Sequence, residues 1–482
     1  MTGPKHSELN VKDVSFINDI KNLAVIGPSK KRDYYFFKNH AIDFKGNAYA
    51  VHPTVKEISG FDRNKIVPSL KDIKEDIDYA WISLPASQVL NVIDECIDKG
   101  VKLVTIFSSD FSDSGTEKGL ILEQLLVKRA QNKVRILGPN GMGLYYPKLG
   151  ICWRSNFPTT AGNIGFIAQS GGMCNIAIYG ASSFGIKFSK VFSFGNGADL
   201  DLVDLLYFLS EDPETDIILC YLEGIKEGRI DDLRKVLEHN KKPVICLKGG
   251  QSKSGSIAAK THTASISGNN KLWNAFFKQY NVIQVDSLEQ LLHTAHILDC
   301  YKAFEINNLA VASISGGYGV VLVDLLAKNG FNIPQFSSDI QKQLNSRFIL
   351  PGTSPKNPLD LAAHFFFENF IYDVLNIALS DINIDGLVLD MPSFYLTPVF
   401  TRSRYNTSFE SIMIESLSLG HKYNKPVIPI IQRLNRPDDR ERVRNILIEK
   451  KVPVFGVPDE FIPILRKISE YKKKLKKKSK NV

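Results

Sequence analysis

Short apolar runs alternate with amphipathic stretches along almost the whole of this 482-residue chain. Many of the apolar runs stop at a glycine or a small polar residue, as LAVIG does at Gly27 and PVICLKGG does at Gly249. Apolar runs separated by helical patterns are typical of βαβ units, in which helices cover both faces of a parallel sheet. The sequence therefore predicts an α/β fold built on parallel sheets.

The length predicts about three domains of ~150 residues each. The pattern divides accordingly into a Rossmann-type domain at 15–150 and two flavodoxin-like domains at 160–300 and 305–470. The expected strands are 23–27, 47–51, 79–84, 101–107 and 134–137, then 164–168, 188–194, 216–222 and 243–247, and finally 309–314, 385–390, 426–431 and 452–455.

Composition excludes several classes of protein. Hydrophobic residues make up 44% and charged residues 23% of the chain, which is ordinary for a globular protein. No apolar run approaches the ~18 residues of a membrane span, and the N-terminus has no apolar segment of a secretory signal. The six scattered cysteines include no C-x-x-C pair and suit a reducing compartment. We therefore expect a cytoplasmic protein.

The basic character of the chain comes from its end. Seven of the net nine positive charges are lysines in the last eleven residues, KKKLKKKSKNV. Such a run can touch RNA or anionic lipid, but it is more often a solvated tail. We expect residues 471–482 to be a disordered, solubilising tail, and we expect neither a nucleic-acid nor a membrane function.

One loop has a composition that packing does not explain. After the predicted strand 243–247 come residues 248–268, KGGQSKSGSIAAKTHTASISG, which are small, polar and rich in hydroxyls, with a single histidine, His262. A neutral imidazole can act as a nucleophile or proton shuttle near pH 7. A flexible surface loop with an idle histidine is the alternative. These residues alone leave both interpretations open.

Three other predicted strands of the same block also end in small or polar residues, QSGGM, GNGADLD and EG. The carboxyl ends of parallel strands meet at one edge of a sheet, so these loops should converge on a site. Ser170 is a plausible N-cap, and the amides of Gly171 and Gly172 behind it would be open to an anion. Glu223 is either a solvated charge or a carboxylate that orients an imidazole.

The first strand-to-helix turn, GPSKKRDYYF, lacks the G-x-G-x-x-G pattern of dinucleotide sites. It does hold Ser29, Lys30, Lys31 and Arg32, which either contact phosphates at a helix start or are plain surface. In the third block, SGGYG at 315–319 permits either close backbone approach or tight packing of strand and helix, and NPLDL at 357–361 is expected to be a loop.

The sequence contains no complete motif for a nucleotide or metal site. Gly250 and Gly255 have the spacing of a Walker loop, but Ser256 stands where the lysine is required. His293 and His296 share one helix face, where a contact between helices is the simpler interpretation. We expect no metal site in this chain.

In combination and in this order, several segments resemble the NDP-forming acyl-CoA synthetases, relatives of succinyl-CoA synthetase. The matching segments are LGPNGMG (137–143), GNIGFIAQSGGM (162–173), FSFGNGADLDLVDLL (192–206), DIILCYLEGIKEGR (216–229), KPVICLKGG (242–250), KTHTASISG (260–268), SISGGYGVVLVDLLAKNGFNIP (313–334) and NPLDL (357–361).

The resemblance implies an alpha subunit made of a CoA-binding Rossmann domain and two flavodoxin-like ligase domains. It also implies a beta partner with an ATP-grasp domain, in which ATP or ADP and magnesium bind, and an alpha2beta2 or similar assembly. The implied reaction joins a small carboxylic acid to CoA while ATP becomes ADP and phosphate, through an acyl phosphate and a phosphohistidine.

The same resemblance assigns roles to residues. His262 stands at the position of the phosphohistidine, Glu223 at that of the glutamate that holds its ring, and Ser170, Gly171 and Gly172 at the phosphate site. The residues expected to contact CoA are Gly27, Ser29, Lys30, Pro53, Pro139 and Asn140.

The sequence departs from the family pattern at three places, and two of them, the shortened turn and Ala264, motivate an alternative. The glycine-rich turn of the CoA domain is shortened to GPSKKRDYY, the usual cysteine of I-G-P-N-C is Gly141, and a usual glycine after the histidine is Ala264. If that position needs a positive φ, an alanine there forces the loop to rearrange. The alternative is a non-catalytic member that binds CoA or acyl-CoA as a sensor or scaffold.

Overall fold

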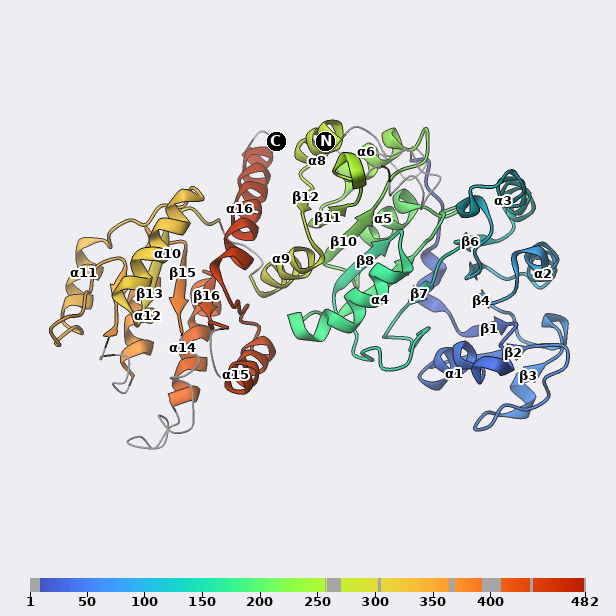
Figure 1. Cartoon of the computed structure of the whole chain (residues 1–482), viewed down its shortest axis with the longest axis horizontal. Helices are drawn as coiled ribbons and strands as arrows, with labels where there is room; N and C mark the ends of the chain where they lie inside the picture. Colours follow the sequence, from blue (N-terminus) through green and yellow to red (C-terminus); the bar gives the residue numbers. More distant parts are fainter. Residues whose placement is uncertain are drawn as a thin grey trace. The chain divides into compact units, whose positions relative to one another are not determined.

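The computed structural model (Figure 1) describes residues 9–255, 257, 270–301, 305–362, 364, 369–391, 409–433 and 437–480. The chain forms two compact units. Unit 1 comprises Met1–Ser182 and Ile186–Leu291, and unit 2 comprises Ser183–Gly185 and Leu292–Val482.

The first sheet of unit 1 has six parallel strands in the order β3-β2-β1-β4-β5-β6, the order of a Rossmann fold. Helix α2 buries Val89, Val92, Ile93 and Cys96, the stripe that helical spacing predicts. The bounds are β1 Asn22–Ile26, β2 Asn47–Val51, β3 Ile66–Val67, β4 Tyr79–Ile82, β5 Leu103–Ile106 and β6 Arg135–Leu137, with helices α1 Tyr35–Ile42, α2 Ala86–Asp98 and α3 Glu117–Ala130.

The second sheet of unit 1 has the order β12-β11-β10-β8-β9-β7. Strands β8 to β12 are parallel and follow the flavodoxin-like order, whereas β7 pairs antiparallel with β9. The bounds are β7 Gly143–Tyr145, β8 Ile164–Ala168, β9 Phe188–Ser193, β10 Ile217–Leu222, β11 Val244–Lys248 and β12 Ile283–Val285, with helices α4 Gly171–Gly180, α5 Leu202–Glu211, α6 Ile230–His239 and α8 Asn270–Gln279. Helix α9 Leu288–Cys300 begins in unit 1 and continues in unit 2.

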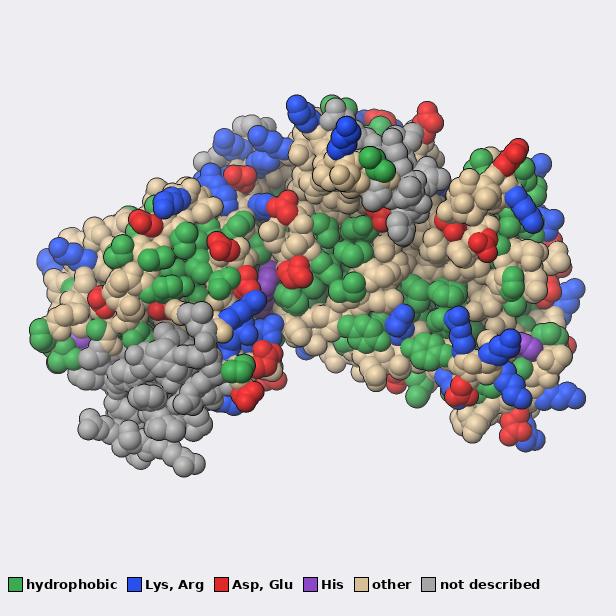
Figure 2. Space-filling model, viewed as in Figure 1, with side chains coloured by type: hydrophobic (Ala, Val, Ile, Leu, Met, Phe, Trp, Pro, Cys, Tyr) green, Lys and Arg blue, Asp and Glu red, His purple; other side chains and the backbone are tan. Residues whose placement is uncertain are grey.

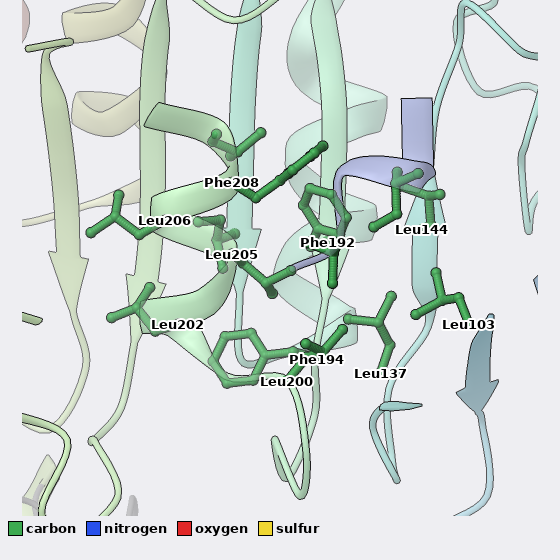
Figure 3. Packing of buried hydrophobic residues seen from close by; sticks show 14 of the residues in the cluster. Leu103, Leu137, Leu144, Phe192, Phe194, Leu200, Leu202, Leu205, Leu206 and Phe208 are labelled. Atoms are coloured by element: carbon green, nitrogen blue, oxygen red, sulfur yellow. The ribbon is translucent and has the colours of Figure 1, made fainter. Parts of the chain in front are cut away.

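One hydrophobic core joins the two sheets of unit 1 (Figure 3). Leu103 and Leu137 come from the first sheet, and Phe192 and Phe194 come from β9 and the residue after it. All four are almost completely buried, and burial of such a side chain stabilises a fold by about 1.5–3 kcal/mol. Loops at the junction of the two sheets therefore lie on a continuous packed core.

Unit 2 contains a four-stranded parallel sheet in the order β14-β13-β15-β16. The first, second and third strands predicted for this block are present, as is a helix after SGGYG, so the α/β fold class with two flavodoxin-like sheets is confirmed. The bounds are β13 Leu309–Ser313, β14 Leu359–Asp360, β15 Gly386–Asp390 and β16 Val427–Ile430, with helices α10 Gly316–Lys328, α11 Ser338–Asn345, α12 Phe370–Ser380, α14 Phe409–Tyr423, α15 Pro437–Glu449 and α16 Pro458–Lys480.

Two predictions for unit 2 were wrong in detail. Residues 452–455 form only a single bridge, Ile430 to Phe455, because Pro453 has no N–H to donate to a ladder. The expected loop NPLDL contains the short strand β14. Asn357 holds it against β13, since its side chain accepts a hydrogen bond from the amide of Val311 at 3.0 Å and donates one to the carbonyl of Leu309 at 2.9 Å.

The basic end of the chain also differs from the prediction. Residues 471–480 continue helix α16 instead of forming a disordered tail. Tyr471 is buried on this helix, and Lys476 Nζ lies 2.9 Å from Glu305 Oε2. Lysine favours the helical state, and cations near a helix C-terminus interact favourably with its dipole, so the charge run extends the helix.

The described helices include none that is both long enough and apolar enough to cross a bilayer. On the face drawn in Figure 2, basic and acidic side chains are interspersed. The domain boundaries 15–150, 160–300 and 305–470 remain a prediction, and β7 lies within the first of these ranges although it belongs to the second sheet.

Candidate functional site

The carboxyl ends of β8, β9 and β10, neighbours in the second sheet, surround a cavity of about 290 Å³. The sequence predicted this convergence from strand ends alone. Of the predicted site residues, the cavity brings together Ser170, Gly171, Gly172, Glu223 and Asn140. The complete lining is Phe107, Asn140, Gly141, Met142, Gln169, Ser170, Gly171, Gly172, Asn175, Gly195, Asn196 and Glu223.

Glu223 presents one unpaired oxygen at this cavity. Its Oε1 accepts a hydrogen bond from the hydroxyl of Tyr221 at 3.1 Å. Its Oε2 is buried and has no hydrogen-bond partner in the described part of the chain. The backbone is fixed as well, because the amides of Glu223 and Gly224 donate to Oε1 of the buried Gln169 at 2.9 and 3.3 Å. A buried acceptor without a partner is costly, so Oε2 is suited to receive a donor from a ligand or an imidazole.

Helix α4 begins at Gly171 beside the glutamate. Ser170 is its N-cap, as predicted, and its hydroxyl accepts from the amide of Met173 at 3.4 Å. The first amides of the helix, those of Gly171 and Gly172, lie ahead of this bond and line the cavity. Helix N-termini attract anions through these amides and through the helix dipole.

Lys248, the last residue of β11, was not predicted as a site residue. It is almost completely buried, and its ammonium donates to the carbonyl oxygens of Glu223, at 2.6 Å, and of Gly249. Burial lowers the pKa of Lys248. This lysine ties the ends of β10 and β11 together just ahead of the predicted histidine loop. His262 and Ala264 themselves lie outside the described residues.

Two glycine-bearing loops meet backbone to backbone on another side of the cavity. Gly195 has a φ of +53°, and a Cβ there would lie 2.2 Å from the carbonyl oxygen of Pro139. A Cβ on Gly141 would lie 2.7 Å from the carbonyl oxygen of Ser193. The glycine at 141, where the family pattern has a cysteine, therefore matches the close packing of these two loops.

The residues predicted to contact CoA fall in two places. Gly27, Ser29, Lys30 and Pro53 follow β1 and β2, adjacent parallel strands of the first sheet. Gly27 has a φ of +77°, and a Cβ would clash with Leu84, so this turn requires glycine.

Pro139 and Asn140 instead follow β6, where Pro139 is buried and Asn140 is exposed and lines the cavity. The structure thus separates the first four of these residues from the last two.

The strand ends of unit 2 carry a second polar cluster. Asp390, the last residue of β15, is fully buried and accepts from Ser313 Oγ at 3.0 Å and from Gln432 Nε2 at 2.8 Å. Burial raises its pKa to about 6. Asp360 lies against the start of α10, where a Cβ on Gly316 would be 2.3 Å from its Oδ2. Gly316 thus permits the close approach of a carboxylate.

A Cβ added to Gly319 would lie 3.4 Å from Ser313 Cβ, so this glycine permits tight packing of the helix on the strand. A Cβ added to Gly317 would have no neighbouring atom within 4 Å. His293 and His296 lie on α9 as predicted; the His293 ring packs 4.7 Å from those of Phe184 and Phe455. No group of three or more His, Cys, Asp or Glu in the described chain is arranged to hold a metal ion.

Replacing Asp390 by asparagine is expected to stabilise unit 2 above pH 6. The folded state holds the Asp390 proton more tightly than the unfolded state, so this group's contribution falls as the pH rises from about 4 through about 6. The difference is on the order of 3 kcal/mol at neutral pH. The stability difference is measured by urea unfolding of both proteins at the same pH, with hydrogen exchange of the β13 and β15 amides as the probe.

The control for this experiment is Asp324→Asn, which changes an exposed aspartate on α10. As a substitution of an exposed residue, it should change the stability by no more than about 0.5 kcal/mol. Equal stability of the Asp390→Asn and wild-type proteins at pH 5 and at pH 8 would contradict the prediction.

Comparison with known proteins places this geometry in a family. The model of a CoA binding domain matches residues 21–147, and that of a succinyl-CoA ligase like flavodoxin domain matches residues 161–298. The alpha subunit of ADP-forming acetate–CoA ligase II from Pyrococcus furiosus is 33% identical over 455 residues, which cover 91% of this chain and 94% of that protein. The chain belongs to the ADP-forming acyl-CoA synthetases.

Other members of the synthetase family differ in length. ADP-forming acetate–CoA ligase of Methanocaldococcus jannaschii is 34% identical over 72% of this chain, which spans 49% of that relative. The solved apo form of dinucleotide forming acetyl-coenzyme A synthetase 1 from Candidatus Korarchaeum cryptofilum matches this chain with a TM-score of 0.82 at 27% identity. The match covers 96% of this chain and 98% of that chain. The family assignment made from sequence motifs is confirmed.

Sequence reasoning missed Phe107, Met142, Asn175 and Asn196, all of which line the cavity. For Asn175 a signal was available, because it lies one helical turn after Gly171 and so shares its face. Phe107 and Met142 come from the first sheet and its last loop, and nothing local in the sequence places them beside α4.

Proposed function

We propose that this chain is the alpha subunit of an ADP-forming acyl-CoA synthetase and that the cavity at the ends of β8, β9 and β10 is where its phosphoryl chemistry occurs. The observation that carries the proposal is the pairing of an anion-ready helix start, α4, with the unpaired Oε2 of Glu223. The former suits a phosphate, and the latter suits the ring N–H of a histidine.

The reaction joins a carboxylic acid, CoA and ATP to give acyl-CoA, ADP and phosphate, and it is reversible. Read from acyl-CoA, a phosphate oxygen attacks the thioester carbonyl carbon, the CoA thiolate leaves, and an acyl phosphate remains. A ring nitrogen of His262 then attacks phosphorus, the carboxylate leaves with the bonding electrons, and a phosphohistidine forms.

The described residues have separate tasks in these steps. The amides at the start of α4 bind phosphate oxygens and stabilise the charge that develops on them. Glu223 accepts the N–H of the other ring nitrogen of His262, which fixes the tautomer and stabilises the imidazolium. Lys248 holds the backbone carbonyl of Glu223 in place.

The same proposal assigns CoA binding and phosphoryl transfer to different parts of the enzyme. CoA binds the Rossmann-type domain through Gly27, Ser29, Lys30, Pro53, Pro139 and Asn140, and the phosphoryl group leaves for a separate ATP-grasp beta subunit that holds ADP and magnesium. The name of the Pyrococcus furiosus relative, a subunit alpha, supports a partner. An alpha2beta2 assembly in the cytoplasm is part of the proposal.

The test starts with the purified chain alone and then adds a partner subunit. Acyl-CoA and radiolabelled inorganic phosphate should deposit acid-labile, base-stable phosphate on the chain, and mass spectrometry should locate it at His262. Addition of an ATP-grasp subunit and ADP should then move the label to ATP. Absence of label both from phosphate with acyl-CoA and from labelled ATP with the partner, or label at another residue, would overturn the proposal.

A non-catalytic member of the family predicts a different pattern. Calorimetry would then show binding of CoA or acyl-CoA, while no phosphate would appear on the chain under either condition. The shortened turn at Ser29 and Lys30 motivates this second function, and the same two measurements separate it from the first.

A further inference from the structure

The cavity has an apolar wall directly beside the start of α4. Met142 is buried, and its Cγ would be only 2.6 Å from a Cβ on Gly171, so its side chain packs on the first residue of the helix. Phe107 continues the wall. The apolar side chain packed directly on the helix start is therefore that of Met142, and Phe107 lines the same cavity.

This wall is supported from behind by aromatic rings. The ring of Phe107 stacks on Trp81 with centroids 5.3 Å apart, and Phe36 lies 5.0 Å from Phe107 and 4.5 Å from Trp81. The indole of the fully buried Trp81 donates to the carbonyl oxygen of Met142 at 3.2 Å. The positions of Phe107 and Met142 are thus fixed by the first sheet.

Asn175 is one of the polar side chains that line this cavity. Its Oδ1 accepts a hydrogen bond from the indole of Trp153 at 2.9 Å. An indole N–H only donates, so this bond fixes which end of the amide faces it. The Nδ2 group has no hydrogen-bond partner in the described part of the chain, and it is the donor that Asn175 has left to offer.

Trp153 is rigid enough to hold that orientation. It is fully buried, with ring contacts to Tyr145 at 6.1 Å and to Phe157 at 5.7 Å. The amide of Asn175 is therefore a preorganised donor one turn from the helix start.

The charges of the cavity lining restrict which acyl groups can bind. The described lining includes the carboxylate of Glu223 and no lysine, arginine or histidine. A second carboxylate on the acid would be buried near Glu223 without a cation, which is unfavourable. The volume of about 290 Å³ is at the small end of ligand pockets, which span ~300–1,000 Å³.

From these contacts we infer that Phe107 and Met142 are the specificity-determining wall for the acyl group and that Asn175 Nδ2 binds the acyl carbonyl oxygen. The subsite takes small acyl groups without a second charge. This inference rests on the proposed function, because it assumes that phosphate binds at the start of α4.

Stable phosphonates test the subsite without turnover. Titration calorimetry of the full chain would compare inorganic phosphate, acetylphosphonate, ethylphosphonate and benzoylphosphonate. Acetylphosphonate has the carbonyl that ethylphosphonate lacks, so the wild type should prefer it by up to about tenfold, the worth of one hydrogen bond. The Asn175→Ala variant should lose this preference and bind phosphate as before.

The apolar wall is tested with the same ligands. Phe107→Ala should shift the ratio of benzoylphosphonate to acetylphosphonate affinity by at least about tenfold towards the larger ligand, because discrimination by size in an apolar pocket is of this order. Phosphate affinity should stay the same. An unchanged ratio would overturn the role of Phe107.

A positioning variant and a matched control complete the test. Trp153→Phe keeps the packing but removes the donor to Asn175, so part of the preference for acetylphosphonate should disappear. Tyr179 lies one turn after Asn175 on α4, and its hydroxyl donates to the carbonyl of Ser155. Tyr179→Phe removes this hydroxyl and should leave the affinities for all four ligands unchanged.

The outcomes separate this inference from the function on which it rests. Binding of phosphate without any preference among the phosphonates, or an equal loss of all four ligands in every variant, would overturn the subsite alone. Failure of the wild type to bind phosphate and phosphonates would overturn the subsite together with the phosphate site at α4.

Discussion

Replacing Glu223 by glutamine is expected to slow phosphorylation of His262 by about 10²–10⁴-fold, the range in which positioned acid–base groups contribute. Glutamine has the same shape but no charge, so the imidazolium that forms as phosphorus is attacked loses its counter-ion. Its amide can also turn a donor towards the ring and select the wrong tautomer. The measurement is the rate at which acid-labile label from inorganic phosphate and acyl-CoA appears on the chain.

Two further variants calibrate this result. His262→Asn should show no label at all and sets the baseline. Tyr221→Phe removes only the hydroxyl that donates to Glu223 Oε1 at 3.1 Å, one neutral hydrogen bond, and should cost less than about tenfold. A Glu223→Gln rate equal to that of the wild type would show that the carboxylate has no part in phosphoryl transfer.

The strands were the most predictable part of the fold. β2 and β8 have the predicted bounds, and most others differ by a residue or two at their ends. Strands buried on both faces are continuous apolar runs, which a sequence displays directly. The strands that were missed, such as β7 and β12, are short or lie at a sheet edge, where fewer residues need to be apolar.

The candidate site was predictable only in part, for a physical reason. Ser170 and Glu223 follow strands that are neighbours in a parallel sheet, so strand order alone brings them together. Phe107 follows β5 of the first sheet, and Met142 lies where the chain crosses from β6 of the first sheet to β7, which pairs with β9 in the second. That crossing depends on the core shared by the two sheets, which no local pattern encodes.

Glycine 141 shows the same limit. It departs from the family pattern, in which this position is usually a cysteine. In the structure its missing Cβ is what lets the loop after β6 lie against the carbonyl of Ser193. Whether a departure weakens a site depends on its neighbours in space, which the sequence does not give.

The largest expected loss of stability comes from Lys190, which lies on β9 within the same unit as the cavity. Its side chain is fully buried, with Nζ 2.9 Å from Asp212 Oδ2 and 2.7 Å from Glu214 Oε2. The ammonium also lies 4.3 Å from the centre of the Tyr146 ring. Burial opposes the charge on Glu214, but hydrogen bonds from Lys148, Lys190 and Tyr146 outweigh it and lower its pKa to about 2.

Lys190→Met keeps the length of the side chain but leaves the fully buried Asp212 without its cation. Removing one partner of a buried ion pair typically costs about 3–5 kcal/mol, because the remaining charge is neither solvated nor compensated. We expect the free energy of unfolding of unit 1 at pH 7 to fall by this amount. Urea unfolding measured by tryptophan fluorescence reports on this unit, because all three tryptophans lie in it.

Lys148→Met is the matched control, because Lys148 also pairs with Glu214 but its side chain is 59% exposed. Exposed pairs contribute about 0–1 kcal/mol, so this variant should unfold almost as the wild type does. Equal losses in the two variants would contradict the prediction, because leaving the buried Asp212 without its cation would then cost no more than removing an exposed lysine.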